Sequence, residues 1–214
     1  MKLLEKYKYI LFDAANTLIH KPSVWEKMFA VLEKHEITIA IDKLRYNHKL
    51  LSEIIDFPDR TSFEFYRGFN QQLILSLGII PTDELLDELF SACKGLPWEK
   101  FDDTESLKEI NIPMGVLSNF NKDLPQLVQQ IFGDIFSDII SSEQLQLRKP
   151  SQEFYERAVA MTGFQKDEIL YVGDSLKLDI IPANKIGVAA LLIDRPGFFG
   201  PNNTTITDLY ALTR

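Results

Sequence analysis

Residues 9–18 read Tyr-Ile-Leu-Phe-Asp-Ala-Ala-Asn-Thr-Leu, an apolar run that ends at a carboxylate. Four more short runs rich in Ile, Val and Leu follow, at residues 114–117, 138–140, 169–172 and 189–193. Apolar runs of this length that end in small or polar residues are typical of buried parallel strands. The pattern therefore predicts a parallel β-sheet whose first strand is residues 9–12.

Helical patterns separate the last four runs. Apolar residues recur at three- and four-residue spacing in 124–131 and 152–161, and a shorter helix is expected at 179–186. Strands that alternate with helices indicate an α/β fold, in which helices cover both faces of a doubly wound parallel sheet. Functional groups in such folds lie in the loops after the carboxyl ends of the strands. The tail after Pro196 is expected to be irregular up to a short final helix.

About a hundred residues separate the first two apolar runs, far more than one crossover connection needs. Helical patterns fill this gap, at residues 24–35, 41–55, 63–77 and 83–93. We therefore expect an all-helical cap over residues 18–100, inserted into an α/β core formed by residues 1–17 and 101–214.

Composition and charge exclude several classes of protein. The formal net charge of −8 argues against a nucleic-acid-binding surface, although a small anionic substrate remains compatible with it. Cys93 is the only cysteine, which excludes an intrachain disulfide and favours a reducing compartment such as the cytoplasm. No uncharged apolar run approaches membrane-spanning length, so no membrane partner is expected. No feature of the sequence indicates an oligomeric state.

Two acidic motifs follow predicted strands. Asp13 ends the first apolar run and precedes small residues and Thr17, which suits a nucleophile or a metal ligand, although an aspartate can also simply cap a turn. Asp174 and Asp179 lie five residues apart, after Gly173. Carboxylates on one rigid loop are ligands that Mg²⁺ prefers, and the alternative is a loop aspartate with a helix N-cap.

Two further motifs complete the set. Ser118 and Asn119 follow the second run and offer a hydroxyl and an amide to an anionic oxygen. Pro150 is expected to start a helix, which leaves Lys149 in the preceding loop, where its ammonium group can neutralise a phosphate. Each pair alone is a common surface feature. Because each motif follows a different strand, all four are expected to converge on one rim of the sheet.

The order Asp-x-x-x-Thr, Ser-Asn, Lys-Pro and Gly-Asp-Ser-x-x-x-Asp resembles the haloacid dehalogenase superfamily, and the likeness covers essentially the whole chain. It implies a Rossmann-like core with a helical cap and a hydrolase acting on a small phosphorylated substrate. In this reading Asp13 is the nucleophile and forms an aspartyl-phosphate. Ser118 and Lys149 hold the phosphoryl oxygens. Thr17 and Asn119 complete the substrate-binding set, in which Asn119 lines the same loop as Ser118 and Thr17 helps to fix the first loop.

The resemblance also implies a Mg²⁺ site. Its ligands would be Asp13, Asp174 and the main-chain carbonyl of Ala15, with Asp179 acting from behind them. The physical reason is charge, because a carboxylate and a phosphoryl group repel each other unless a cation offsets their charges.

Ala15 departs from the phosphatases of this superfamily, which carry an aspartate there to protonate the leaving group. A methyl group cannot do so, and such acid–base help is typically worth ~10²–10⁴ in rate. We favour a phosphatase in which His20, His48 or water supplies the proton, or whose substrate has a good leaving group.

Other interpretations stay open. A carbon–halogen hydrolase also lacks this aspartate, although such relatives generally lose the Gly-Asp pair that is intact at 173–174. A phosphonate-cleaving enzyme would need a cap lysine as a Schiff base, for which Lys27, Lys43 and Lys49 are available. A relative without turnover, acting through binding, is a further possibility.

Overall fold

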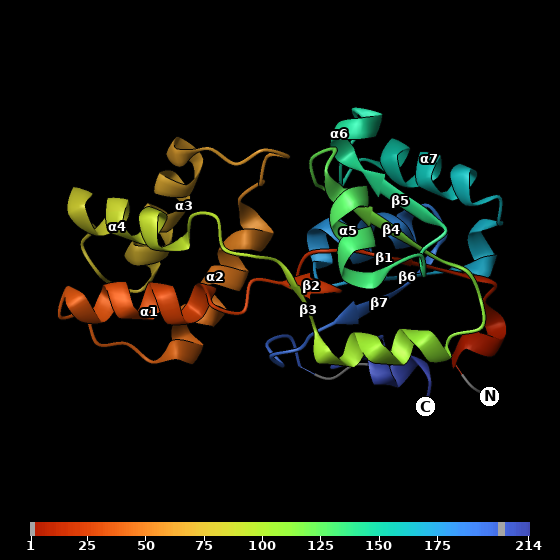
Figure 1. Cartoon of the computed structure of the whole chain (residues 1–214), viewed down its shortest axis with the longest axis horizontal. Helices are drawn as coiled ribbons and strands as arrows, with labels where there is room; N and C mark the ends of the chain where they lie inside the picture. Colours follow the sequence, from red (N-terminus) through yellow and green to blue (C-terminus); the bar gives the residue numbers. More distant parts are fainter. Residues whose placement is uncertain (1–2, 201–203) are drawn as a thin grey trace. The chain divides into compact units, whose positions relative to one another are not determined.

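The computed structural model describes residues 3–200 and 204–214 of the chain (Figure 1). The chain divides into two compact units. One unit contains the chain up to His20 and from Lys100 to Arg214, and the other spans Lys21–Glu99. The first unit is built on a parallel sheet and the second on helices.

The sheet has six strands in the order β5-β4-β1-β6-β7-β8, and every neighbouring pair is parallel. The predicted α/β fold class is confirmed, and the five predicted strands are found to within one residue at each end. Their bounds are β1 Tyr9–Phe12, β4 Met114–Ser118, β5 Asp138–Ser141, β6 Ile169–Gly173 and β7 Ala189–Ile193, and the edge strand β8 is Thr205–Ile206.

The strand order determines where functional loops meet. The chain passes from β1 to β4 and β5 on one side, and then returns to β6 on the other side of β1. Sheets with this order bind ligands beyond the carboxyl ends of the strands where the direction reverses, which here is between β1 and β6. Asp13 directly follows β1 and Asp174 directly follows β6, so the topology alone brings these two carboxylates together.

Both faces of the sheet are buried. On one face Tyr9 and Tyr171 belong to a core shared with α7 (Gln152–Thr162) and α8 (Ile181–Lys185). On the other face the ring of Phe12 lies 6.3 Å from that of Phe136, which in turn contacts Phe132 of α5 (Leu124–Phe132). Each large side chain buried in this way contributes roughly 1.5–3 kcal/mol, and burial on two faces explains why the strands are apolar throughout.

Three sequence-based expectations for this unit are corrected. The helix expected at 179–186 begins earlier, with a π-helical turn at Leu176–Ile180 that leads into α8. The turn forms because the hydroxyl of Ser175 accepts the N–H of Leu178. Pro150 does not start α7, because a tight turn from Arg148 to Ser151 precedes the helix. The tail after Pro196 is not irregular throughout, since β8 adds to the sheet edge.

The remaining short elements of this unit lie before the first strand, between the strands and in the tail. They are η1 Leu3–Lys6, η2 Asp102–Glu109, α6 Ser142–Leu145, η3 Lys166–Glu168 and η5 Leu209–Leu212. A separate two-stranded sheet pairs β2, Ile19–His20, with β3, Glu99–Lys100.

The helical unit contains four helices, each within one residue of its predicted bounds. They are α1 Val24–Lys34, α2 Ile41–Ile54, α3 Phe63–Ser76 and α4 Asp83–Cys93. Ser62 and Thr82 cap α3 and α4 by accepting main-chain N–H groups three residues later. Within the part of the chain that the structure describes, no helix is both long and apolar enough to span a bilayer.

Candidate active site

Asp13 lies at the carboxyl edge of the sheet. Its main-chain N–H donates to Val172 O at 2.8 Å, which extends the ladder between β1 and β6 by one residue. Its side chain is buried, and two predicted partners reach the same oxygen. The hydroxyl of Ser118 lies 3.2 Å from Asp13 Oδ1, and Lys149 Nζ lies 2.6 Å from it. The structure therefore brings together residues from three separate motifs.

Lys149 bridges two carboxylates. Its ammonium group also donates to Asp179 Oδ1 at 2.7 Å, and only 3% of the residue is exposed. Burial acts to lower the pKa of Lys149, but the negative charges of Asp13 and Asp179 outweigh it and raise the pKa. The site therefore contains a fixed positive charge.

Asn119 holds the main chain of Lys149. Its Oδ1 accepts the N–H of Lys149 at 2.8 Å, and its Nδ2 donates to Lys149 O at 3.1 Å. Both ends of the amide thus bind the main chain of Lys149, so Asn119 links the loop after β4 to the loop that carries Lys149.

Three carboxylates form a compact group that fits a divalent cation. Asp13, Asp174 and Asp179 each offer an oxygen, and these oxygens lie within 4.8 Å of one another. Hard oxygen donors of this kind suit Mg²⁺ and similar ions. Burial, and then the neighbouring Asp179 and Asp174, raise the pKa of Asp13 to about 7, although Lys149 opposes the shift. A divalent cation bound at this cluster would offset negative charge on the three carboxylates.

Asp179 is already well supplied with hydrogen-bond donors. Besides Lys149, its Oδ1 accepts the hydroxyl of Tyr171 at 2.8 Å, and its Oδ2 accepts the N–H of Ser175 at 2.9 Å. A side chain at Gly173 would place its Cβ 2.4 Å from the carboxyl carbon of Asp179, so only glycine leaves room for it. Asp13 and Asp174 are therefore better placed to hold a metal than Asp179.

The loop after Asp13 is a tight turn. The N–H groups of Leu18 and Ile19 both donate to Ala14 O, and Asn16 adopts the left-handed conformation with φ 60°. Thr17 is fully buried, and its carbonyl accepts a guanidinium N–H of Arg195 at 2.7 Å. The loop is thus fixed through main-chain contacts.

Arg195 is a site-supporting residue that the sequence did not reveal. Its other terminal nitrogen pairs with Asp103 Oδ2 at 2.6 Å, and its guanidinium lies 3.8 Å from the ring centroid of Phe101. The one sequence feature that could have identified Arg195 is its position, because it closely follows the strand β7 at the same edge of the sheet.

The family model of the haloacid dehalogenase-like hydrolases matches residues 7–187. The chain belongs to this hydrolase family. A glyceraldehyde 3-phosphate phosphatase of Methanocaldococcus jannaschii is 32% identical over 41% of this chain, and the matched part is 39% of that relative's length. A protein of the same name from Methanopyrus kandleri is 23% identical over 88% of this chain and 84% of its own length. The solved structure of the magnesium-bound HAD-hydrolase YfnB of Bacillus subtilis matches this chain with a TM-score of 0.66 and 16% sequence identity. The match covers 98% of this chain and 100% of the YfnB chain, and it shows the same fold.

Two of the three histidines of this haloacid dehalogenase-like hydrolase, His20 and His48, have aromatic surroundings. The His20 ring stacks on Phe101 with centroids 3.9 Å apart. In the helical unit His48 packs against Trp25 and Phe69, and burial lowers its pKa to about 4. His48 is therefore neutral near pH 7 and carries no acidic imidazolium proton.

Two of the three lysines considered for a Schiff base have partners in the helical unit. Lys49 forms an ion pair with Glu53 at 2.9 Å, and Lys43 Nζ lies 3.4 Å from Leu77 O. An ion-paired ammonium group is a poor amine nucleophile, so Lys49 does not favour the phosphonate-cleaving interpretation.

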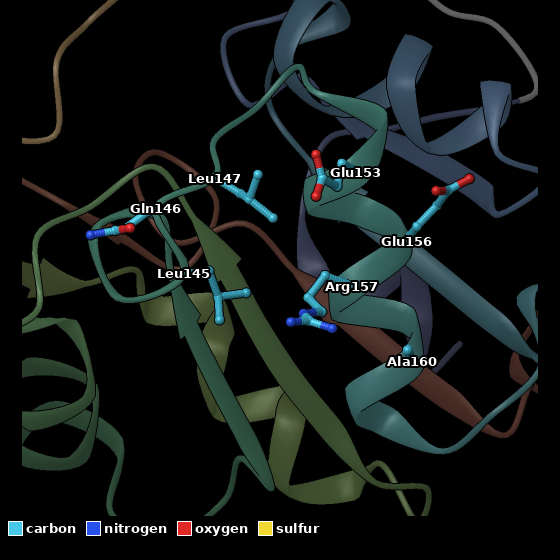
Figure 2. Close-up of a pocket in the computed structure, with 7 residues that line it drawn as sticks. All are labelled: Leu145, Gln146, Leu147, Glu153, Glu156, Arg157 and Ala160. Carbon is cyan, nitrogen blue, oxygen red and sulfur yellow. The ribbon is translucent and has the colours of Figure 1, made fainter.

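A surface pocket of about 530 Å³ lies between the 145–147 segment and α7 (Figure 2). Figure 2 shows Leu145 and Leu147 on one side, and Glu153, Glu156 and Arg157 on α7 on the other. None of the site residues predicted from the sequence lines it. The candidate active site is therefore defined by the carboxylate cluster and not by this pocket.

Proposed function

We propose that this hydrolase is a magnesium-dependent phosphatase that acts on a small phosphorylated metabolite through an aspartyl-phosphate on Asp13. The observation that carries the proposal is the environment of Asp13 Oδ1, which meets a hydroxyl at 3.2 Å and an ammonium group at 2.6 Å inside a three-carboxylate cluster. The names of the two archaeal relatives support a phosphorylated small molecule as the substrate class. The single cysteine supports the cytoplasm as the compartment.

In the proposed reaction the carboxylate of Asp13 attacks phosphorus while the bond from phosphorus to the leaving oxygen breaks. Ser118 and Lys149 donate hydrogen bonds to the phosphoryl oxygens, where negative charge accumulates. Asp13, Asp174 and the carbonyl of Ala15 would hold the cation, which would offset the negative charges of nucleophile and substrate. Water then cleaves the aspartyl-phosphate, releases phosphate and regenerates Asp13. Thr17 and Asn119 keep the two loops in place.

Ala15 limits the range of leaving groups that this mechanism can expel. A methyl group supplies no proton to the departing oxygen, so groups that leave as stable anions are the substrates we expect to react fastest. A second candidate, carbon–halogen hydrolysis, is favoured by the same residue, because a halide leaves without a proton. The intact acidic cluster favours phosphoryl transfer over it, since a metal site is useful against a dianionic phosphate.

A substrate screen tests the proposal directly. Aryl, acyl and alkyl phosphates, 2-haloacids and phosphonates would be assayed with Mg²⁺ and with chelator. We expect aryl and acyl phosphates to be hydrolysed in the presence of Mg²⁺ and not in chelator. The rate of Asp13→Asn with Mg²⁺ should be at least ~10³-fold lower than that of the wild type, because the amide cannot act as the nucleophile. Full 2-haloacid turnover in chelator, or retained phosphatase activity in folded Asp13→Asn, would contradict it.

Metal binding is measured separately, without turnover. Asp174→Ala should weaken Mg²⁺ binding in calorimetry by at least about tenfold, since a direct carboxylate ligand is lost. The matched control is Asp167→Ala, an exposed aspartate that lies just before β6 at the opposite end of the strand. Equal Mg²⁺ affinity in the two variants would show that Asp174 is not a ligand.

A further inference from the structure

Tyr171 is a buried polar residue at the centre of the sheet. It lies in β6, is fully inaccessible to solvent, and belongs to the core shared with α7 and α8. Its hydroxyl donates to Asp179 Oδ1 at 2.8 Å, whereas the carbonyl of Leu117 is 3.5 Å away. A phenylalanine would fill the same space, so the hydroxyl requires a separate explanation.

The hydroxyl is the first member of a chain of hydrogen bonds that ends at the nucleophile. Asp179 Oδ1 accepts both Tyr171 and Lys149, and Lys149 donates also to Asp13 Oδ1. At most 6% of any of these four residues is exposed. In such surroundings a change at one hydrogen bond is felt by its neighbours, because water does not replace the lost partner.

Two carboxylates compete for one ammonium group in this chain. A hydrogen bond from Tyr171 stabilises the negative charge on Asp179 and reduces the share that Lys149 must satisfy. The N–H of Ser175 holds the second oxygen, so the carboxylate keeps one orientation. Without the hydroxyl, Asp179 would attract Lys149 more strongly and draw it away from Asp13.

We propose that Tyr171 is a positioning residue that holds Asp179, so that the ammonium group of Lys149 stays directed at Asp13 and at the phosphoryl group. The inference rests on the proposed function, since it assigns Lys149 a part in phosphoryl transfer. Tyr171 lies behind Asp179 and acts only through it.

The test is Tyr171→Phe with Tyr9→Phe as the matched control. Tyr9 lies in the same core, is 1% exposed, and donates to a different carboxylate, Asp138 Oδ2, at 2.6 Å. With an aryl phosphate and Mg²⁺, kcat of Tyr171→Phe should fall about ten- to a hundredfold, the loss of one hydrogen bond to a charged group. KM should stay within about threefold, because Lys149 matters most in the transition state. Tyr9→Phe should retain its kcat.

A loss of stability alone would not give this pattern. Both variants remove the hydroxyl of a buried tyrosine that donates to a carboxylate, so both would lose activity if folding were the cause. In an Asp179→Asn background Tyr171→Phe should add little further loss, because the chain is already interrupted. Equal kcat values for Tyr171→Phe and Tyr9→Phe would overturn the positioning role. The same holds if the loss of kcat caused by Tyr171→Phe is as large in the Asp179→Asn background as in the wild type.

A crystal structure of Tyr171→Phe separates this inference from the proposed function. Lys149 Nζ is expected to move away from Asp13 Oδ1 toward Asp179. Unchanged contacts, at the present 2.6 Å and 2.7 Å, would overturn the inference. A wild type that hydrolyses no phosphate would instead contradict the proposed function, and the crystal structure would still decide the role of Tyr171.

Discussion

Asp13 illustrates how one residue acquires its chemistry from its neighbours. An isolated aspartate has a pKa near 4, but burial beside Asp174 and Asp179 raises the pKa of Asp13 to about 7. A carboxyl group in this state needs compensating positive charge before it can remain ionised near pH 7 and serve as the proposed nucleophile. Lys149 supplies part of that charge in the protein itself, and a cation bound between Asp13 and Asp174 would supply the rest.

A substitution at Gly173 would show how closely Asp179 is packed, because it adds a single carbon atom beside that carboxylate. Gly173→Ala would place a methyl group 2.4 Å from the Asp179 carboxyl carbon, so Asp179 must move and its contact with Lys149 must weaken. We expect kcat to fall at least about tenfold, the effect of losing one charged hydrogen bond. The measurement is kcat of the folded variant with an aryl phosphate.

The control for Gly173 is Gly163→Ala at the end of α7. Gly163 has a positive φ of 75° and no neighbour within 4 Å of an added Cβ, so the change costs stability without reaching the site. If both variants retain full kcat, the close packing of Asp179 on Gly173 does not matter for catalysis.

The main site residues could be predicted from the sequence because each stands at or beyond the carboxyl end of a different strand. Asp13, Ser118, Lys149 and Asp179 stand in separate motifs, and a parallel sheet brings strand ends together. The supporting contacts could not be predicted in this way. Tyr171 reads as one more apolar position of a strand, and its hydroxyl meets Asp179 only because the π-helical turn folds back over Gly173.

At the scale of the elements, apolar spacing predicted most helices and strands to within one residue. Long periodic segments such as α2 and α3 carry enough repeats for their type to be clear. The strand β8 has two residues and no periodicity, so its place at the sheet edge follows from pairing with β7. The turn at Leu176–Ile180 was missed because its start depends on one side-chain hydrogen bond from the N–H of Leu178 to Ser175.

Helix α2 offers a prediction about pH, because it carries His48 among aromatic rings. The pKa of His48 is lowered to about 4, below its ordinary value of 6.5, so the unfolded chain binds the proton more readily. Stability should therefore fall as the pH drops from about 6.5 toward 4. Because His48 is only partly buried and solvent screens its charge, we expect a loss on the order of 2 kcal/mol.

His48→Phe keeps an aromatic ring against Trp25 and Phe69 and removes the titration. Denaturant unfolding at pH 7 and pH 4.5 should show a smaller acid-induced loss in the variant than in the wild type. Parallel losses in both proteins would show that His48 does not contribute to the pH dependence of the helical unit.

At the scale of the whole molecule, the fold alone does not determine which reaction is catalysed. The α/β sheet and its strand order place reactive groups at one edge, and the residues at that edge determine what they do. In this chain the acidic cluster and Lys149 favour phosphoryl transfer, whereas Ala15 removes the group that would protonate the departing oxygen. The range of substrates that the protein accepts should reflect both the acidic cluster with Lys149 and the missing acid at position 15.

Under the proposed function the rate should depend steeply on the pKa of the leaving group, because the methyl group of Ala15 gives no proton to the departing oxygen. Aryl and acyl phosphates should react far faster than alkyl phosphates, provided that phosphorylation of Asp13 limits the rate. Ala15→Asp would restore a carboxylate and should flatten this dependence. Alkyl phosphate turnover should rise by about one to two orders of magnitude, part of the ~10²–10⁴ typical of such groups, since a new carboxylate lacks an evolved supporting environment. Ala15→Asn is the matched control, because it has a similar size and no acidic proton. If the wild type hydrolyses alkyl and aryl phosphates equally well, another group already supplies the proton, and substitution of His20 is the next experiment.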